Sequence, residues 1–163
     1  MRVLVVDDEL PIMQLCVKVL EDAGHVVEGF SRGESLLARL GAEPADLLVV
    51  DYRMPGPNGV QVVRRARALR PEIPVVMITG HGTPEVLAEA HAAGVTGVLL
   101  KPFAPAALVE AVRRALGATS NMGGPDMARP PYGGPRMAPQ SPQGSGRPGE
   151  AVTPLESPTR FVP

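Results

Sequence analysis

Five short runs of apolar residues recur along the first 116 residues, and their spacing constrains the fold more than any other feature of the chain. The runs are Arg2–Val6, Val26–Glu28, Leu47–Val50, Val75–Ile78 and Gly97–Leu100. Their starts lie 24, 21, 28 and 22 residues apart, so each gap has room for one helix. Runs such as residues 47–50 are continuously apolar, which is typical of strands buried on both faces of a parallel sheet.

The segments between these runs carry the period of amphipathic helices. In the first gap an apolar face is followed by Gly24, a residue suited to ending a helix. Pro84 suits the first turn of another helix through Ala93, and residues 33–40 give the weakest helical pattern. The apolar stripes are Ile12, Leu15, Cys16, Val19 and Leu20; Val62, Val63, Ala66 and Leu69; and Leu108, Val112 and Ala115. Alternating strands and helices predict a five-stranded, parallel, doubly wound α/β domain over residues 1–116.

Proline and glycine change the character of the chain after Leu116. They make up 18 of the last 47 residues, compared with 19 of the first 116. The last segment shows no helical or strand period and has few apolar side chains to offset the entropy lost on ordering. We therefore expect residues 117–163 to form a disordered, Pro/Gly-rich tail; a peptide motif recognised by a partner is the alternative.

Charge and composition exclude several classes of protein. The first 116 residues carry 12 Lys and Arg against 14 Asp and Glu, so the basic excess needed for non-specific nucleic-acid binding is missing. No apolar stretch reaches the roughly 18 residues of a membrane span, and acidic residues follow the first run where a signal peptide would still be apolar. A single cysteine excludes an internal disulfide. We expect a cytoplasmic protein that binds neither membranes nor DNA directly.

Two further features have a purely structural interpretation. Arg64, Arg65, Arg67 and Arg70 lie mainly off the apolar stripe of their predicted helix, which favours a solvated face over an acidic docking patch. Cys16 lies on a buried stripe, so we expect it to serve in packing rather than in chemistry.

Polar side chains follow four of the five predicted strands at the point where each strand ends. Asp7 and Asp8 follow the first run, Asp51 the third, Thr79 the fourth and Lys101 the fifth. Each residue alone has an ordinary explanation as a loop, turn or strand residue. Ligands of doubly wound sheets bind at the carboxyl ends of the strands, however, where these side chains would converge. Three crowded carboxylates repel one another unless a cation lies among them, and oxygen ligands with an open position suit Mg²⁺.

Four motifs in this order and spacing resemble the receiver domain of bacterial two-component response regulators, including the single-domain chemotaxis type. They are Val3–Glu9, Leu48–Gly56, Val76–Gly80 and Leu99–Phe103. The resemblance covers about residues 1–116 and implies a flavodoxin-like fold with strand order 2-1-3-4-5. The tail has no counterpart in the family.

The resemblance implies a metal site. Asp8 and Asp51 match direct ligands of Mg²⁺, Asp7 matches an aspartate that acts through water, and the backbone carbonyl of Arg53 completes the protein ligands. These assignments imply that Mg²⁺ is the cofactor.

The resemblance also implies a site for phosphoryl transfer. Asp51 matches the phosphoacceptor, Thr79 the switch hydroxyl and Lys101 the lysine that pairs with the phosphoryl group. A cis peptide often joins that lysine to the following proline, here Pro102. His81 stands where the family tunes dephosphorylation, with a plain loop histidine as the alternative.

These roles imply a stand-alone response regulator rather than a turnover enzyme. It would take a phosphoryl group from a histidine kinase or a phosphotransfer protein and signal through altered binding of a downstream protein. One alternative is a haloacid-dehalogenase-type phosphatase. That fold needs an aspartate two residues after its first-strand nucleophile and a late acidic pair, and this sequence does not match that pattern. Another is a degenerate receiver used as a scaffold, which is disfavoured because every chemical position is filled.

The chain departs from the family at Val98. Many receivers have a tyrosine or phenylalanine three residues before the strand-5 lysine, and its ring moves when the switch hydroxyl engages phosphate. Valine is too short and too stiff at χ1 for that movement. We therefore expect the conformational change to be concentrated in residues 80–83 and the start of the following helix.

Overall fold

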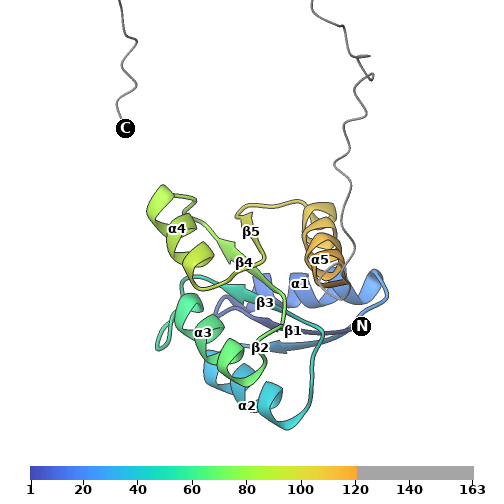
Figure 1. Cartoon of the computed structure of the whole chain (residues 1–163). Helices are drawn as coiled ribbons and strands as arrows, with labels where there is room; N and C mark the ends of the chain where they lie inside the picture. Colours follow the sequence, from blue (N-terminus) through green and yellow to red (C-terminus); the bar gives the residue numbers. More distant parts are fainter. Residues whose placement is uncertain (121–163) are drawn as a thin grey trace, which may run out of the picture. The chain divides into compact units, whose positions relative to one another are not determined.

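A parallel sheet of five strands forms the centre of the computed structural model, which describes residues 1–120 (Figure 1). The strands are β1 (Arg2–Val6), β2 (Val26–Phe30), β3 (Leu47–Asp51), β4 (Val75–Thr79) and β5 (Gly97–Leu100). They pair in the order β2-β1-β3-β4-β5, and every pairing is parallel. The predicted fold class and strand order are confirmed.

Five helices alternate with the strands. They are α1 (Leu10–Asp22), α2 (Gly33–Ala42), α3 (Gly59–Leu69), α4 (Pro84–Ala92) and α5 (Pro105–Ser120). The predicted helix with the weakest pattern is present as α2. Helix α5 continues four residues past the predicted domain end; residues 117–119 are exposed, so they leave no apolar period in the sequence. The rest of the predicted tail lies outside the described residues.

The two faces of the sheet form two hydrophobic clusters. Alternate residues of the inner strands point to opposite faces. One face packs against α1 and α5, and the other packs against α2, α3 and α4. All residues of β3 and β4 are buried, which explains their continuously apolar sequences. Each buried valine or leucine stabilises the fold by about 1.5–3 kcal/mol, so these strands hold the carboxyl edge of the sheet in place.

Cys16 is fully buried in the cluster beneath α1 and α5, as predicted. Burial raises the pKa of its thiol to about 11, so the thiol stays protonated at neutral pH. Its role is packing.

The expectation of a solvated arginine face is wrong for Arg67. Arg64, Arg65 and Arg70 are exposed, but Arg67 is half-buried and donates hydrogen bonds to the backbone carbonyls of Pro71 (2.7 Å) and Gly94. Gly94 adopts a φ of +85° where the chain leaves α4. Arg67 therefore ties α3 to the α4–β5 turn, a contact that helical periodicity does not reveal.

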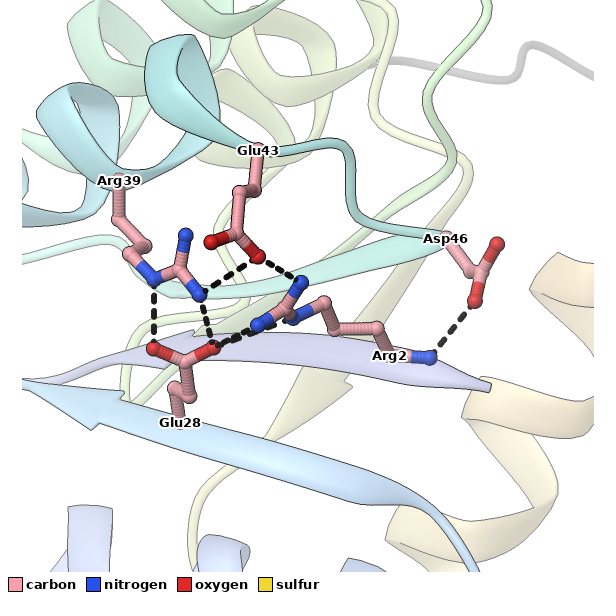
Figure 2. A network of polar contacts seen from close by, with 5 residues as sticks. All are labelled: Arg2, Glu28, Arg39, Glu43 and Asp46. Atoms are coloured by element: carbon pink, nitrogen blue, oxygen red, sulfur yellow. Dashed lines mark hydrogen bonds and ion pairs between the residues drawn. The ribbon is translucent and has the colours of Figure 1, made fainter.

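A polar network joins the edge strand β2 to the start of β1 and the end of α2 (Figure 2). Glu28 accepts two hydrogen bonds from Arg39 (2.8 and 3.0 Å) and one from Arg2 (3.1 Å). Glu43 binds both arginines, and the backbone N–H of Arg2 donates to Asp46. Hydrogen bonds from Arg39 hold the pKa of Glu28 below its ordinary value. Because solvent reaches these side chains, each pair adds little stability.

Among residues 1–120, no helix combines the length and the apolar character that a membrane span requires.

Gly59 is the glycine that lies closest to the backbone at the end of β3. A Cβ there would lie 2.3 Å from the carbonyl oxygen of Asp51 and 2.8 Å from the Cα of Tyr52, and backbone atoms cannot move aside. We predict that Gly59→Ala lowers the free energy of unfolding by about 1–3 kcal/mol. Gly41→Ala, in α2 with open space around it, is the matched control and is expected to stabilise by about 0.5–1 kcal/mol. Urea denaturation of both variants measures the difference, and equal stabilities would contradict the prediction.

Candidate functional site

Four neighbouring strands bring the predicted site residues to one edge of the sheet. Asp51 and Thr79 are the last residues of β3 and β4, Asp7 and Asp8 directly follow β1, and Lys101 directly follows β5. Because β1, β3, β4 and β5 are adjacent and parallel, all of their carboxyl ends lie on the same side. The structure thus joins groups that are up to 94 residues apart in the sequence.

The three aspartates form an acidic cluster at this edge. One carboxylate oxygen from each of Asp7, Asp8 and Asp51 lies within 4.8 Å of the other two. Asp7 and Asp51 are only 1% and 3% exposed, whereas Asp8 is open to solvent. A donor set made of oxygen atoms alone, partly buried and partly open, fits a hard divalent cation such as Mg²⁺.

Lys101 is the basic side chain that lies against this acidic cluster. Its ammonium lies 3.0 Å from an oxygen of Asp7, 3.1 Å from one of Asp51 and 3.1 Å from one of Glu9. The Lys101 side chain is 16% exposed, so its charge is partly shielded from water. One ammonium faces several carboxylates, and net negative charge remains.

Burial and repulsion set the protonation of these groups. Burial, together with the charge of Asp7, raises the pKa of Asp51 to about 6 against the opposing effect of Lys101. Burial also raises the pKa of Asp7 despite its hydrogen bond from Lys101. For Lys101, burial by itself lowers the pKa, but the interactions with Asp7 and Asp51 outweigh it and hold the pKa above its ordinary value.

Thr79 is buried, and its hydroxyl is bonded within its own loop. Its Oγ1 donates to the carbonyl of His81 (3.2 Å) and accepts from the N–H of His81 (3.1 Å). His81 is exposed, and Thr83 caps α4 by accepting from the N–H of Val86. The hydroxyl of Thr79 is therefore connected to the start of α4 through a short loop.

The β3–α3 loop carries the remaining residue of the predicted metal site. Arg53 lies two residues after Asp51 with an exposed side chain, and the role of its carbonyl stays a prediction. Asn58 and Gln61 form a reciprocal capping box that begins α3 just after this loop. The peptide bond between Lys101 and Pro102 is cis, as the resemblance implied.

Sequence reasoning missed two contacts of the site. Glu9 pairs with Lys101, and the phenol of Tyr52, next to Asp51, donates a 2.9 Å hydrogen bond to Glu89 on α4. Both residues stand beside the aspartates of the motifs, but their partners lie 92 and 37 residues away and no local pattern points to them.

The fold and this edge together define a receiver domain: a parallel sheet in the order 2-1-3-4-5 with an acidic cluster, a buried threonine and a lysine at its carboxyl end. The chain belongs to the response regulator receiver family, since residues 3–113 match the model described as the response regulator receiver domain. This match favours the receiver over the phosphatase alternative.

Known proteins agree with this assignment. The chain is 34% identical to the response regulator receiver protein CpdR of Brucella abortus, over 71% of this chain and 96% of that protein. It is 35% identical to the transcriptional regulatory protein DctD of Rhizobium meliloti, over 69% of this chain but only 25% of that protein. The solved structure of the chemotaxis protein CheY4 of Vibrio cholerae matches with a TM-score of 0.68 and 34% identity, covering 70% of this chain and 97% of that one.

The raised pKa of Asp51 predicts how stability depends on pH. The ordinary pKa of 3.8 becomes about 6 in the folded protein, so the folded state binds more protons than the unfolded state between about pH 4 and 6. The protonated form of Asp51 therefore favours the folded state, and the free energy of unfolding falls as the pH rises through this window. We predict that Asp51→Asn, in EDTA at pH 7, is more stable than wild type by about 1–3 kcal/mol, with the gain fading toward pH 4.

Urea denaturation between pH 4 and 7.5 measures this effect, and Asp22→Asn, on the exposed face of α1, is the control for removal of a carboxylate. Adding Mg²⁺ should narrow the difference at pH 7, because a bound cation stabilises the wild-type cluster alone. A variant with the same pH slope as wild type would contradict the assigned cause.

Proposed function

We propose that this chain is a stand-alone response regulator that accepts a phosphoryl group on Asp51 and signals by altered binding of a protein partner. The observation that carries the proposal is the buried carboxylate of Asp51 with the ammonium of Lys101 3.1 Å away and two further aspartates beside it. The match along 96% of CpdR supports a regulator that acts without an output domain of its own.

The donor that fits this site is a phosphohistidine on a histidine kinase or a phosphotransfer protein. A carboxylate oxygen of Asp51 attacks phosphorus, the bond from phosphorus to the histidine nitrogen breaks, and an acyl phosphate forms. Lys101 is placed to pair with the added negative charge. The phosphoryl group is held on the protein rather than turned over, so we propose a signalling role and not that of an enzyme.

The acidic cluster would hold Mg²⁺ through Asp8 and Asp51, with the carbonyl of Arg53. Both carboxylate oxygens of Asp7 already accept hydrogen bonds, one from Lys101 and one from the N–H of Glu9, which favours a role through water. When bound, Mg²⁺ supplies positive charge that offsets the carboxylates and the phosphoryl oxygens.

We propose that Thr79 is the residue whose hydrogen bond changes when Asp51 is phosphorylated. Its hydroxyl has one proton to donate, and that proton goes to the carbonyl of His81. A phosphoryl oxygen on Asp51 competes for the same proton, so engaging it releases the hydrogen bond that holds the loop. Val98 is half-buried on β5 and has no ring to move, which leaves this loop as the responding element.

Labelling by acetyl phosphate tests the phosphoacceptor. We predict stoichiometric labelling of wild type in Mg²⁺ and none of Asp51→Asn, because an amide is not a nucleophile. Asp46→Asn, at the opposite end of β3 from Asp51 and bonded to the start of β1, is the control and should label normally. Equal labelling of Asp51→Asn and wild type would overturn the assignment.

Amide chemical shifts test the role of Thr79. On addition of beryllofluoride and Mg²⁺, wild type should show changes concentrated in residues 80–83 and the start of α4, with β5 nearly still. Thr79→Ala should lose most of the loop changes, because it lacks the hydroxyl that the phosphoryl mimic engages. Loop shifts in Thr79→Ala that match those of wild type would show that another group acts as the switch.

A further inference from the structure

Helix α4 is thinly anchored to the rest of the domain. Of its nine residues only Ala90 is buried, and Leu87 is 41% exposed. Figure 1 shows α4 at the margin of the sheet, above the end of β4. An element with few buried contacts has a low local stability, so a single specific contact can decide where it lies.

The hydrogen bond from Tyr52 to Glu89 is such a contact. The phenol oxygen of Tyr52 lies 2.9 Å from Oε2 of Glu89. Among residues 1–120 it is the only hydrogen bond or ion pair between a side chain of α4 and a side chain of another element. The backbone of Tyr52 is held by its N–H bond to the carbonyl of Ile78 (2.8 Å), and its ring packs against the cluster beneath α3 and α4. Tyr52 is thus fixed in place by the sheet and the core, and its hydrogen bond restrains α4.

We propose that Tyr52 is a positioning residue whose hydrogen bond to Glu89 holds α4 in the unphosphorylated position and opposes the change that phosphorylation of Asp51 produces. The inference rests on the proposed function and extends it, because it names a restraint within α4 that is separate from the Thr79 loop at the start of the helix.

Two connections reach α4 from the site, and they respond differently to phosphorylation. The first runs from Thr79 through His81 to Thr83, the N-cap of α4, and is released when Thr79 turns to a phosphoryl oxygen. The second is the Tyr52–Glu89 bond, whose donor directly follows β3 and lies outside the Thr79 loop. A displacement of α4 by more than about 0.5 Å lengthens this bond beyond hydrogen-bonding distance. The bond is therefore lost when α4 takes the position of the phosphorylated protein, and it stabilises only the position of α4 in the unphosphorylated protein.

The absence of an aromatic side chain at Val98 makes this restraint more important. Tyr52 is the only tyrosine in residues 1–120, and it stands one residue after the phosphoacceptor rather than on β5. The aromatic residue that distinguishes the two positions of α4 would thus directly follow the strand that ends in Asp51.

Beryllofluoride affinity and amide hydrogen exchange of the 163-residue chain test the proposal. Tyr52→Phe removes only the hydroxyl, and Glu89→Ala removes the acceptor. Each should bind beryllofluoride in Mg²⁺ about three- to tenfold more tightly than wild type, as expected for loss of one hydrogen bond from the unliganded state. The double variant should bind no more tightly than either single one, because both substitutions break the same bond.

Two controls separate this role from general destabilisation. Glu89→Gln keeps an oxygen acceptor and should restore near wild-type affinity, and Glu85→Ala removes an exposed carboxylate of the same helix and should leave affinity unchanged. In the absence of beryllofluoride, Tyr52→Phe should speed exchange several-fold in α4 but not in α5.

Unchanged beryllofluoride affinity in Tyr52→Phe, or unchanged exchange in α4, would overturn the inference and leave the proposed function intact. If wild type itself fails to bind beryllofluoride, the proposed function falls, and the inference falls with it.

Discussion

The contact of Lys101 with the buried carboxylates of Asp7 and Asp51 is the interaction on which the arrangement of this domain depends. Two ionised carboxylates at the end of a buried sheet repel each other and lose hydration, as the raised pKa of Asp51 shows. The ammonium offsets part of this cost only because β5 ends beside β4, where its side chain reaches both aspartates at 3.0–3.1 Å. The remaining negative charge makes the edge receptive to a divalent cation.

The parts of the domain differ in how deeply they are buried, and therefore in how firmly they are held. The strands β3 and β4 are buried along their whole length and hold Asp51 and Thr79 between two hydrophobic clusters. The loop after Thr79 and the helix α4 bury almost nothing and are restrained by individual hydrogen bonds. Under the proposed function, a change of charge at Asp51 would act on the few contacts that can be exchanged, while the sheet stays in place.

Several contacts escaped prediction for a common reason. Arg67 lies off the apolar stripe of α3, so the sequence pattern indicates a solvated side chain, yet it binds the carbonyl of Gly94 across the α4–β5 turn. Tyr52 and Glu89 look like an ordinary loop residue and an ordinary helix charge. Helical and strand periods describe which face of an element is buried, but they carry no information about which polar groups meet between elements.

The sequence by itself determined the order of strands and helices, the continuously apolar cores of β3 and β4, and the residues that end each strand, because apolar periodicity and turn chemistry are local properties. Parallel strands also bring those ends to one edge, so the candidate site residues were predictable together. Only the tertiary structure decided that Lys101 faces Asp7, Glu9 and Asp51, that the hydroxyl of Thr79 is bonded to His81, and that Tyr52 donates to Glu89 of α4. The contacts of Lys101 and Tyr52 join positions distant in the sequence that the packing of the elements brings within 3 Å or so, a distance scale that spacing along the chain does not encode.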